Sequence, residues 1–543
     1  MSELLSIRDL TVPLPATADR RYAVEGLSYD LAMNEILCIV GESGSGKSMT
    51  ANAIMGLLPP NMRPERGEIL FQGQDLLKLS EPALESMRGR QIGMIFQEPL
   101  SALNPLMTVG DQIEEVMLVH KVGDAAGRRA RVLELLDFVG LPDPKSLRDA
   151  YPFRLSGGQR QRVVIAMALA LEPALLIADE PTTALDVTTQ AQILDLIRRV
   201  QRDKGMGVMF ITHDFGVVAD IADRVVVMEK GLIVEQGTVD QVLNRPQHPY
   251  TRRLIAAVPH GEGRQNQVAQ GRPIIETRNL KKTYRSGGGL FSAPREVRAL
   301  AGVSLQLHAG ETLGIVGESG SGKSTLGRAI MKLMSVDSGQ ILFRGQDLVP
   351  LSPSQFRPMR RHIQMVFQDP FASLNPRQTI GRILTDGPVA NGISHASAAA
   401  KARELLSMVG LAENAFDRYP HEFSGGQRQR VGIARALMLD PEVLVADESV
   451  SALDVSVQAQ VLQLLKSLQE RLNLAIIFIT HDLRVAAQVC DRIGVMCQGE
   501  LVEEGPSAQI FDNPTHPYTQ KLIAAIPGRN WDPTTSLTER VDA

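Results

Sequence analysis

The chain has 543 residues, of which 44% are hydrophobic and 22% charged, with a formal net charge of −4. This balance disfavours nucleic-acid binding, which requires a basic face, and three cysteines in a chain this long exclude a disulfide framework and supply no zinc-ligand spacing. The sequence contains no run of about 18 or more apolar residues, so we expect no segment that spans a bilayer. The first residues lack a basic region before an apolar core, so we expect no secretory signal. We therefore expect a cytosolic protein of several domains, since one hydrophobic core stops growing at roughly 250–300 residues.

The first strong motif is a glycine-rich loop at residues 41–48, Gly-Glu-Ser-Gly-Ser-Gly-Lys-Ser. The apolar run at residues 35–40 predicts a strand before the loop, and a helical pattern follows it. A loop of the form G-x-x-x-x-G-K-[ST] turns its N–H groups toward phosphate oxygens, and the next helix adds its positive end. We expect Lys47 on the β- and γ-phosphates and Ser48 on Mg²⁺. The predicted nucleotide-binding residues are Gly41, Glu42, Ser43, Gly44, Ser45, Gly46, Lys47 and Ser48.

The middle of the first half changes character. Residues 111–140 show helical patterns without strand signals, whereas short apolar runs stand at residues 174–178 and 209–212. Continuous apolar runs indicate strands buried on both faces, as in a parallel sheet covered by helices. We therefore expect a mostly parallel α/β core with a helical subdomain inserted between Gln97 and Ser156.

An acidic pair ends the strand predicted near residues 175–178. Asp179 and Glu180 are neighbours, and neighbouring strand residues point to opposite sides, so the two carboxylates should have different tasks. Asp179 suits second-shell coordination of Mg²⁺, and Glu180 suits polarisation of an attacking water. Helix capping is the alternative task for either acid.

The motifs of the first half occur again in the second half. The octapeptide returns letter for letter at residues 317–324, and the acidic pair returns as Asp447 and Glu448. The second set of predicted nucleotide-binding residues is Gly317, Glu318, Ser319, Gly320, Ser321, Gly322, Lys323 and Ser324. The expected organisation is a first module at residues 1–259, a polar linker at 260–272, a second module at 273–529 and a tail at 530–543.

Two further motifs complete the set in each module. Ser156-Gly157-Gly158-Gln159 and Ser424-Gly425-Gly426-Gln427 are each followed by Arg-Gln-Arg. His213 and His481 each follow an apolar run that ends in Ile-Thr. The signature, the acidic pair and the histidine all recur at one offset of 268 residues, as from Ser156 to Ser424. In this order the motifs resemble those of ATP-binding-cassette (ABC) ATPases, and the resemblance covers nearly the whole chain.

The resemblance implies the α/β class: tandem P-loop NTPase (ABC) domains, each a mostly parallel sheet core with an inserted helical subdomain and an antiparallel β edge. It implies that Lys47 shares one ATP with Ser424, Gly425, Gly426 and Gln427, and Lys323 another with Ser156, Gly157, Gly158 and Gln159. ATP would then pair the two modules within one chain. The implied catalytic residues are Glu180, Glu448, His213, His481, Gln97 and Gln368. The implied Mg²⁺ residues are Ser48, Gln97, Asp179, Ser324, Gln368 and Asp447.

The modules differ at one expected contact. Tyr284 stands where the family places an aromatic ring against adenine, but the aligned residue of the first module is Leu14. We therefore expect weaker base stacking in the first module. Neither module lacks its lysine, glutamate, histidine or signature glycines, so we expect both to hydrolyse ATP.

Two further segments resemble the dipeptide and oligopeptide importers in particular. Gln-Glu-Pro at residues 97–99 leads to Ser-Ala-Leu-Asn-Pro, with a counterpart at residues 368–376, and in the family this region docks the permease. Each module also ends in His-Pro-Tyr-Thr, at residues 248–251 and 516–519. We interpret that motif as the start of a helix that packs on the core rather than as a catalytic group.

The importer resemblance implies partners and a location. The partners would be two integral membrane permease subunits and a periplasmic peptide-binding protein, without nucleic acid. The chain would lie peripherally at the cytoplasmic face of the bacterial inner membrane. Fused modules of this kind look most like the ATPase of Yej-type importers for oligopeptides and microcin C, and the glutathione importer ATPase is the nearest alternative.

Two other classes fit less well. Tandem cassettes that act on ribosomes carry a long charged linker, and those that act on DNA carry zinc-binding cysteines or coiled coils, none of which this sequence contains. Exporters lack the importer-type loops. Cargo selectivity belongs to the permease and the binding protein, so the sequence of the ATPase does not name the cargo.

Overall fold

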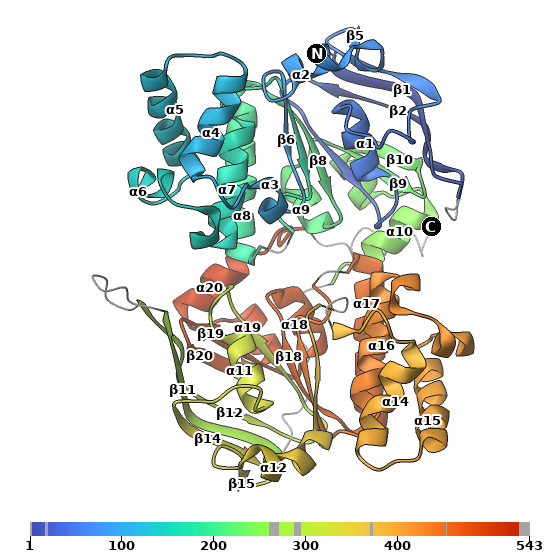
Figure 1. Ribbon diagram of the computed structural model, residues 1–543, viewed down its shortest axis with the longest axis vertical. Helices are drawn as coiled ribbons and strands as arrows, with labels where there is room; N and C mark the ends of the chain where they lie inside the picture. Colours follow the sequence, from blue (N-terminus) through green and yellow to red (C-terminus); the bar gives the residue numbers. More distant parts are fainter. Residues whose placement is uncertain are drawn as a thin grey trace. The chain divides into compact units, whose positions relative to one another are not determined.

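The computed structural model describes residues 3–16, 20–183, 185–259, 271–286, 295–369, 373–451 and 453–531. The chain forms two compact units, built mainly from Met1–Leu185 with Thr189–Val258 and from Pro259–Ile526. Each unit contains one six-stranded and one four-stranded sheet (Figure 1). Most of the expected linker and tail, and residues 370–372 of the second importer-type loop, lie outside the described residues.

The central sheet of the first unit has six strands in the order β10-β9-β3-β8-β7-β6. Five strands are parallel, and β10 pairs antiparallel with β9 at one edge. The strands are β3 (Ile36–Val40), β6 (Ile92–Ile95), β7 (Leu175–Asp179), β8 (Gly207–Thr212), β9 (Arg224–Glu229) and β10 (Leu232–Thr238). Every residue of β3, β7 and β8 is buried, as their apolar sequences predict.

An antiparallel sheet of four strands lies beside this core in the order β2-β1-β4-β5. Its strands are β1 (Glu3–Pro13), β2 (Tyr22–Ala32), β4 (Arg66–Phe71) and β5 (Gln74–Asp75). Leu5 and Ile7 of β1 belong to the same buried cluster as Ile39 of β3 and Met209 of β8. One hydrophobic core therefore fixes the antiparallel sheet against the parallel sheet that carries the phosphate loop.

The helices of the first unit divide into those that cover the sheet and those of the insert. They are α1 (Lys47–Ile54), α2 (Glu81–Met87), α3 (Pro99–Ala102), α4 (Val109–Val119), α5 (Ala125–Phe138), α6 (Pro144–Arg148), α7 (Gly157–Ala168), α8 (Val187–Lys204), α9 (Phe215–Ile221) and α10 (Pro249–Ala256). Three short turns complete the unit: η1 (Leu76–Lys78), η2 (Pro152–Arg154) and the π-helical η3 (Asp240–Asn244). Within this unit α4 and α5 lie on one flank, and the β1–β2 sheet lies on the other (Figure 1).

The second unit repeats both sheets. Its central order is β16-β17-β18-β13-β19-β20, and its antiparallel order is β12-β11-β14-β15. The central strands are β13 (Thr312–Val316), β16 (Ile363–Val366), β17 (Val443–Asp447), β18 (Ala475–Ile479), β19 (Arg492–Cys497) and β20 (Glu500–Pro506). The antiparallel strands are β11 (Ile275–Ser286), β12 (Arg295–Leu307), β14 (Ser338–Phe343) and β15 (Gln346–Asp347).

The helices of the second unit follow the same plan, with α14 and α15 on the flank opposite the β11–β12 sheet (Figure 1). They are α11 (Lys323–Ile330), α12 (Pro353–Phe356), α14 (Ile380–Ala390), α15 (His395–Met408), α16 (Gly425–Leu437), α17 (Val455–Leu472), α18 (Leu483–Val489), α19 (Ser507–Asp512) and α20 (Pro517–Ala524). The short turns are η4 (Arg357–Arg361), η5 (Glu413–Asp417) and η6 (Pro420–Glu422).

The predicted fold class is confirmed in both units. Each has a mostly parallel sheet, an antiparallel sheet at its side and helices inserted after the strand that precedes the glutamine motif. Within the described part of the chain, no helix combines the length and the apolar character needed to cross a membrane.

Candidate functional site

Each glycine-rich loop connects a buried central strand to a helix, β3 to α1 and β13 to α11. Gly41 and Gly317 have φ angles of 153° and 147°. A Cβ at these positions would overlap the carbonyl oxygens of Met228 and Met496 on the neighbouring strands. Only glycine lets the loop pass so close to the sheet. The loop is therefore seated directly on the carboxyl edge of the parallel strands.

The loop lysines are buried and turn inward. Lys47 is 5% exposed, and its Nζ donates to the carbonyl oxygens of Gly41 at 2.7 Å and Glu42 at 2.9 Å. Lys323 makes the same two contacts at 2.7 and 2.8 Å. Burial lowers the pKa of Lys323, although the carboxylates around it oppose that shift. Both amines lie on the concave side of the phosphate loop, where they would contact phosphate oxygens.

The residues predicted to hold Mg²⁺ come together in pairs. The Ser48 hydroxyl donates to Asp179 Oδ1 at 3.1 Å, and the Ser324 hydroxyl donates to Asp447 Oδ1 at 2.9 Å. Burial raises the pKa of both aspartates, and the adjacent glutamate of each pair raises it further.

This oxygen set fits Mg²⁺, which takes one or two protein ligands and completes its shell with water and nucleotide phosphates. Among the described residues there is no cluster of three or more His, Cys, Asp or Glu side chains that could hold a metal ion. A cation here would neutralise charge on the phosphates.

The glutamate of each acidic pair is held by the two residues predicted to act with it. Gln97 Nε2 donates to Glu180 Oε2 at 3.0 Å, and His213 Nδ1 lies 3.4 Å from Glu180 Oε1. The contact between Gln368 Nε2 and Glu448 Oε2 is 2.7 Å, and that between His481 Nδ1 and Glu448 Oε1 is 3.7 Å. The structure therefore gathers all six predicted catalytic side chains into two equivalent triads.

These contacts keep the glutamates ionised. Burial alone would raise the pKa of Glu180, but the hydrogen bond and charge of His213, together with Lys47, outweigh burial and lower that pKa to about 2. The pKa of Glu448 is lowered for the same reasons, through His481 and Lys323. Burial opposes protonation of His481, yet Glu448 raises the pKa of that histidine. A carboxylate that stays charged can polarise a water.

The sequence did not predict the backbone of these glutamates. Glu180 and Glu448 have φ angles of 47° and 44°, in the left-handed region that non-glycine residues rarely adopt. Backbone strain of this kind is typical of functional sites. The turn aims each carboxylate toward its glutamine and histidine rather than along the strand direction.

The signature motifs form helix N-termini. Ser156 caps the 12-residue α7, with its hydroxyl accepting from the Gln159 N–H at 3.2 Å and Gln159 Oε1 accepting from the Ser156 N–H at 2.9 Å. Ser424 and Gln427 repeat this capping box at the start of α16. Helix N-termini attract anions. Pairing of each signature with the lysine of the opposite unit stays a prediction.

The residue predicted to stack on adenine in the second unit has an accessible ring, and its adenine contact stays a prediction. Tyr284 on β11 is 44% exposed, and the Lys282 amine lies 5.9 Å from the centre of its ring. In the first unit Leu14 lies one residue past the end of β1 and packs against the core. Sequence reasoning did not consider Tyr22, an aromatic residue of β2 that pairs with Pro13, the residue before Leu14.

The His-Pro-Tyr-Thr motifs begin α10 and α20, as interpreted from the sequence. Their tyrosines also reach the phosphate loops: the Tyr250 hydroxyl accepts from the Glu42 N–H at 3.1 Å, and the Tyr518 hydroxyl accepts from the Glu318 N–H at 3.1 Å. These residues are 208 and 200 positions apart in the chain, so nothing in the local sequence pattern pointed to the contact.

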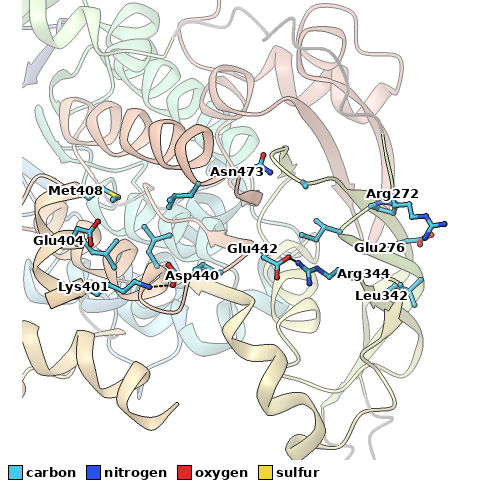
Figure 2. Close-up of a pocket in the computed structure, with 18 of the residues that line it drawn as sticks. Arg272, Glu276, Leu342, Arg344, Lys401, Glu404, Met408, Asp440, Glu442 and Asn473 are labelled. Atoms are coloured by element: carbon cyan, nitrogen blue, oxygen red, sulfur yellow. Dashed lines mark hydrogen bonds and ion pairs between the residues drawn. The ribbon is translucent and has the colours of Figure 1, made fainter. Parts of the chain in front are cut away.

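Two cavities of the second unit lie outside the phosphate loop. One of about 700 Å³ is lined by Phe367, Gln368 and Pro388, between the glutamine motif and the inserted helices. The other, of about 1260 Å³, contains the ion pairs Lys401–Asp440 and Arg344–Glu442 (Figure 2). None of the predicted catalytic or nucleotide-binding residues lines this second cavity.

Comparison with protein-family models matches the ABC transporter family at residues 24–183 and 300–451. The oligopeptide/dipeptide transporter C-terminal region matches at residues 234–291 and 502–540. The family match covers more than half of the chain, once in each unit.

Curated relatives match over nearly the full length. The chain is 47% identical to the glutathione import ATP-binding protein GsiA of Salmonella typhimurium, across 97% of this chain and 90% of that protein. It is 46% identical to GsiA of Escherichia coli O157:H7, across 96% of this chain and 89% of that protein. A solved dimeric bacterial ABC transporter cassette is 30% identical and covers 44% of this chain and 99% of its own, with a TM-score of 0.40. The chain belongs to the ATP-binding proteins of ABC transporters, in the oligopeptide/dipeptide branch, and is an ATPase coupled to transport.

Proposed function

We propose that this chain energises the import of glutathione. The observation that carries the proposal is its 47% identity with glutathione import ATP-binding proteins across 97% of the chain. That similarity favours glutathione over the Yej-type reading of the sequence. An oligopeptide cargo remains the second candidate because the C-terminal regions of both units match the oligopeptide/dipeptide transporter model.

Two permease subunits and a periplasmic binding protein are the partners that such an importer requires. The cavity of about 700 Å³ beside Gln368 supports a docking role, because it joins the catalytic glutamine to the inserted helices. A permease helix seated there would contact the residue that holds Glu448, which gives transport a route to hydrolysis. The chain would then lie peripherally at the cytoplasmic face of the inner membrane.

The hydrolytic mechanism follows from the contacts in each unit. Lys47 and the loop N–H groups would bind the β- and γ-phosphates, while Ser48 and Asp179 would hold Mg²⁺, which neutralises phosphate charge. Glu180 would polarise the attacking water, with Gln97 and His213 orienting its carboxylate. The second unit would do the same with Lys323, Ser324, Asp447, Glu448, Gln368 and His481.

Two ATP sites, each formed by the phosphate loop of one unit and the signature motif of the other, would couple the units. In this proposal the α16 N-terminus, beginning at Ser424, closes over the phosphate bound by Lys47, and the α7 N-terminus, beginning at Ser156, closes over that bound by Lys323. The capped helix starts support this role, since their N–H groups and positive ends favour an anion. ATP would then hold the units together until hydrolysis.

The test of cargo is ATPase activity in vesicles that contain this chain with its genomically adjacent permease and binding protein. Glutathione-loaded binding protein should stimulate phosphate release severalfold over the empty protein, and a tetrapeptide should not. Stimulation by the tetrapeptide alone would replace glutathione with an oligopeptide cargo. The matched control is the Glu180→Gln/Glu448→Gln chain, which should give no stimulated release.

A further inference from the structure

The C-terminal region of each unit makes one contact with the phosphate loop that hydrolysis chemistry does not account for. The Tyr250 hydroxyl accepts a hydrogen bond from the Glu42 N–H and lies 3.4 Å from the carboxylate of the same residue. Tyr518 accepts from the Glu318 N–H in the same way. The contact therefore occurs independently in both units, at the same distance of 3.1 Å.

The Tyr250 contact is made to a peptide unit that the lysine of the phosphate loop also contacts. The Glu42 N–H and the Gly41 carbonyl belong to one planar peptide group. Lys47 Nζ holds the carbonyl side at 2.7 Å, and the Tyr250 hydroxyl holds the N–H side at 3.1 Å. Gly317, Lys323 and Tyr518 repeat this two-sided grip.

These two contacts on one peptide group become important when the lysine amine binds phosphate. A Lys47 amine drawn to phosphate would weaken its bond to the Gly41 carbonyl, and Gly41 has a φ of 153°, where glycine has wide conformational freedom. The Tyr250 hydroxyl would still accept from the N–H of this peptide. Without it the N–H would lie against an apolar ring, and the loop could rotate away from the orientation that nucleotide binding needs.

The His-Pro-Tyr-Thr sequence builds the grip residue by residue. Glu235 on β10 accepts from the N–H groups of Gln247 and His248, which fixes the approach to the helix. His248 Nδ1 accepts from the Tyr250 N–H at 3.3 Å and so caps α10, and the proline occupies the first helical position. Thr251 is fully buried and anchors the turn in the core.

The second unit uses the same parts. Glu503 on β20 accepts from the N–H groups of Thr515 and His516, and His516 Nδ1 accepts from the Tyr518 N–H at 3.2 Å. Burial raises the pKa of both tyrosine hydroxyls, so both remain protonated at physiological pH.

We propose that Tyr250 and Tyr518 are positioning residues for nucleotide binding, and that the C-terminal region of each unit pre-orders its phosphate loop through one hydroxyl. This inference concerns ATP and does not depend on the transported cargo. It assigns the tyrosine of the His-Pro-Tyr-Thr motif a role beyond packing on the core.

The test removes each hydroxyl and keeps the ring. Tyr250→Phe, Tyr518→Phe and the double variant are titrated with ATP and Mg²⁺ in the full-length Glu180→Gln/Glu448→Gln chain, which should bind without turnover. Each single variant should weaken one of two binding events roughly three- to tenfold, as expected for one hydrogen bond. With turnover restored, the Michaelis constant for ATP should rise more than kcat falls.

Tyr29→Phe is the matched control, because the Tyr29 hydroxyl is buried in the first unit and contacts Met209 rather than the loop. It should change the melting temperature at most and leave ATP affinity unchanged. Unchanged affinity in Tyr250→Phe and Tyr518→Phe would overturn the inference, as would an equal loss in Tyr29→Phe. The titration decides the matter even if hydrolysis requires the permease.

Discussion

The two cassettes agree most closely where they would face phosphate. The lysine amine lies 2.7 Å from the first loop carbonyl in both, and the glutamine amide lies 3.0 Å from its glutamate in one and 2.7 Å in the other. The lysine contact closes the loop that follows β3 or β13, and the glutamine contact joins the ends of two paired central strands, so the sheet fixes the geometry. We therefore expect equal hydrolytic chemistry in the two cassettes.

They differ on the adenine side. The second cassette presents Tyr284 on β11, whereas the first has Leu14 packed on the core and Tyr22 on the neighbouring strand. Adenine stacking requires an exposed aromatic face. The halves can therefore share one chemistry and still differ in nucleotide affinity.

They also differ in a cavity beside the inserted helices. The seventh residues of α5 and α15 pair alike, Arg131 with Glu172 and Lys401 with Asp440. The last residues of the long helices differ, with Lys204 in the first cassette and Leu472 in the second. The cavity beside α5 has a volume of about 60 Å³. The cavity beside α15 has about 1260 Å³ because it also extends along β11 and β14, where Glu276 and Leu342 line it. The packing around the inserted helices therefore differs more between the two cassettes than the contacts of the phosphate loops and acidic pairs do.

The substitution with the largest expected effect tests whether the two cassettes hydrolyse ATP equally. Glu180→Gln with Glu448→Gln should lower steady-state turnover by about a hundredfold or more while nucleotide binding remains, because each substitution removes the polarising carboxylate. Phosphate release and a nucleotide titration measure the two quantities. If the cassettes act independently and equally, each single variant retains about half of the activity. Undiminished turnover in the double variant contradicts the role of these carboxylates.

The sequence located the residues that the structure brings together at the candidate site, because they lie in short contiguous motifs. A loop such as residues 41–48 and a pair such as Asp179–Glu180 each carry their own local geometry, and the duplication showed where each module repeats. The fold class followed from the apolar runs, which became fully buried strands.

The features that the sequence did not predict depend on contacts between residues far apart in the chain or on backbone conformation. The Tyr250–Glu42 bond joins residues 208 positions apart, and only the packing of α10 brings them together. The left-handed backbone of Glu180 and Glu448 arises from the turn after the strand, where no glycine marks it. The cavity in the second cassette depends on how several helices end, which no single motif encodes.

The next effect concerns the adenine side. Tyr284→Ala should weaken ATP binding at the second cassette by about 0.5–1.5 kcal/mol, because it removes the stacking face. A two-site nucleotide titration measures the change, and Tyr284→Phe is the control that keeps the ring. Tyr22→Ala tests the aromatic residue of β2 that lies opposite Pro13 in the first cassette. A larger loss from Tyr22→Ala than from Tyr284→Ala would reverse the expected order of the two sites.

A smaller effect tests the cavity. Phe138 and Met408 are the last residues of α5 and α15 and line the corresponding cavities. Phe138→Met should destabilise the first cassette by about 1 kcal/mol, and Met408→Phe should stabilise the second by about 0.5 kcal/mol, since swaps of similar volume cost less than about 1.5 kcal/mol. Thermal unfolding measures both. Destabilisation by Met408→Phe would show that this cavity does not accept more side-chain volume.

The smallest expected effect would make the first cassette resemble the second. Leu14→Tyr places a ring at the position that corresponds to Tyr284 and should tighten ATP binding at the first cassette by a fraction of the ~0.5–1.5 kcal/mol of a stacked pair. The gain is only a fraction because Leu14 packs on the core, so a tyrosine must first turn outward. Leu14→Met is the control, since it changes shape without adding a ring. An unchanged dissociation constant in the titration would mean that Tyr22 or the loop alone sets adenine affinity in the first cassette. The difference between the two cassettes would then not come from the side chain at position 14.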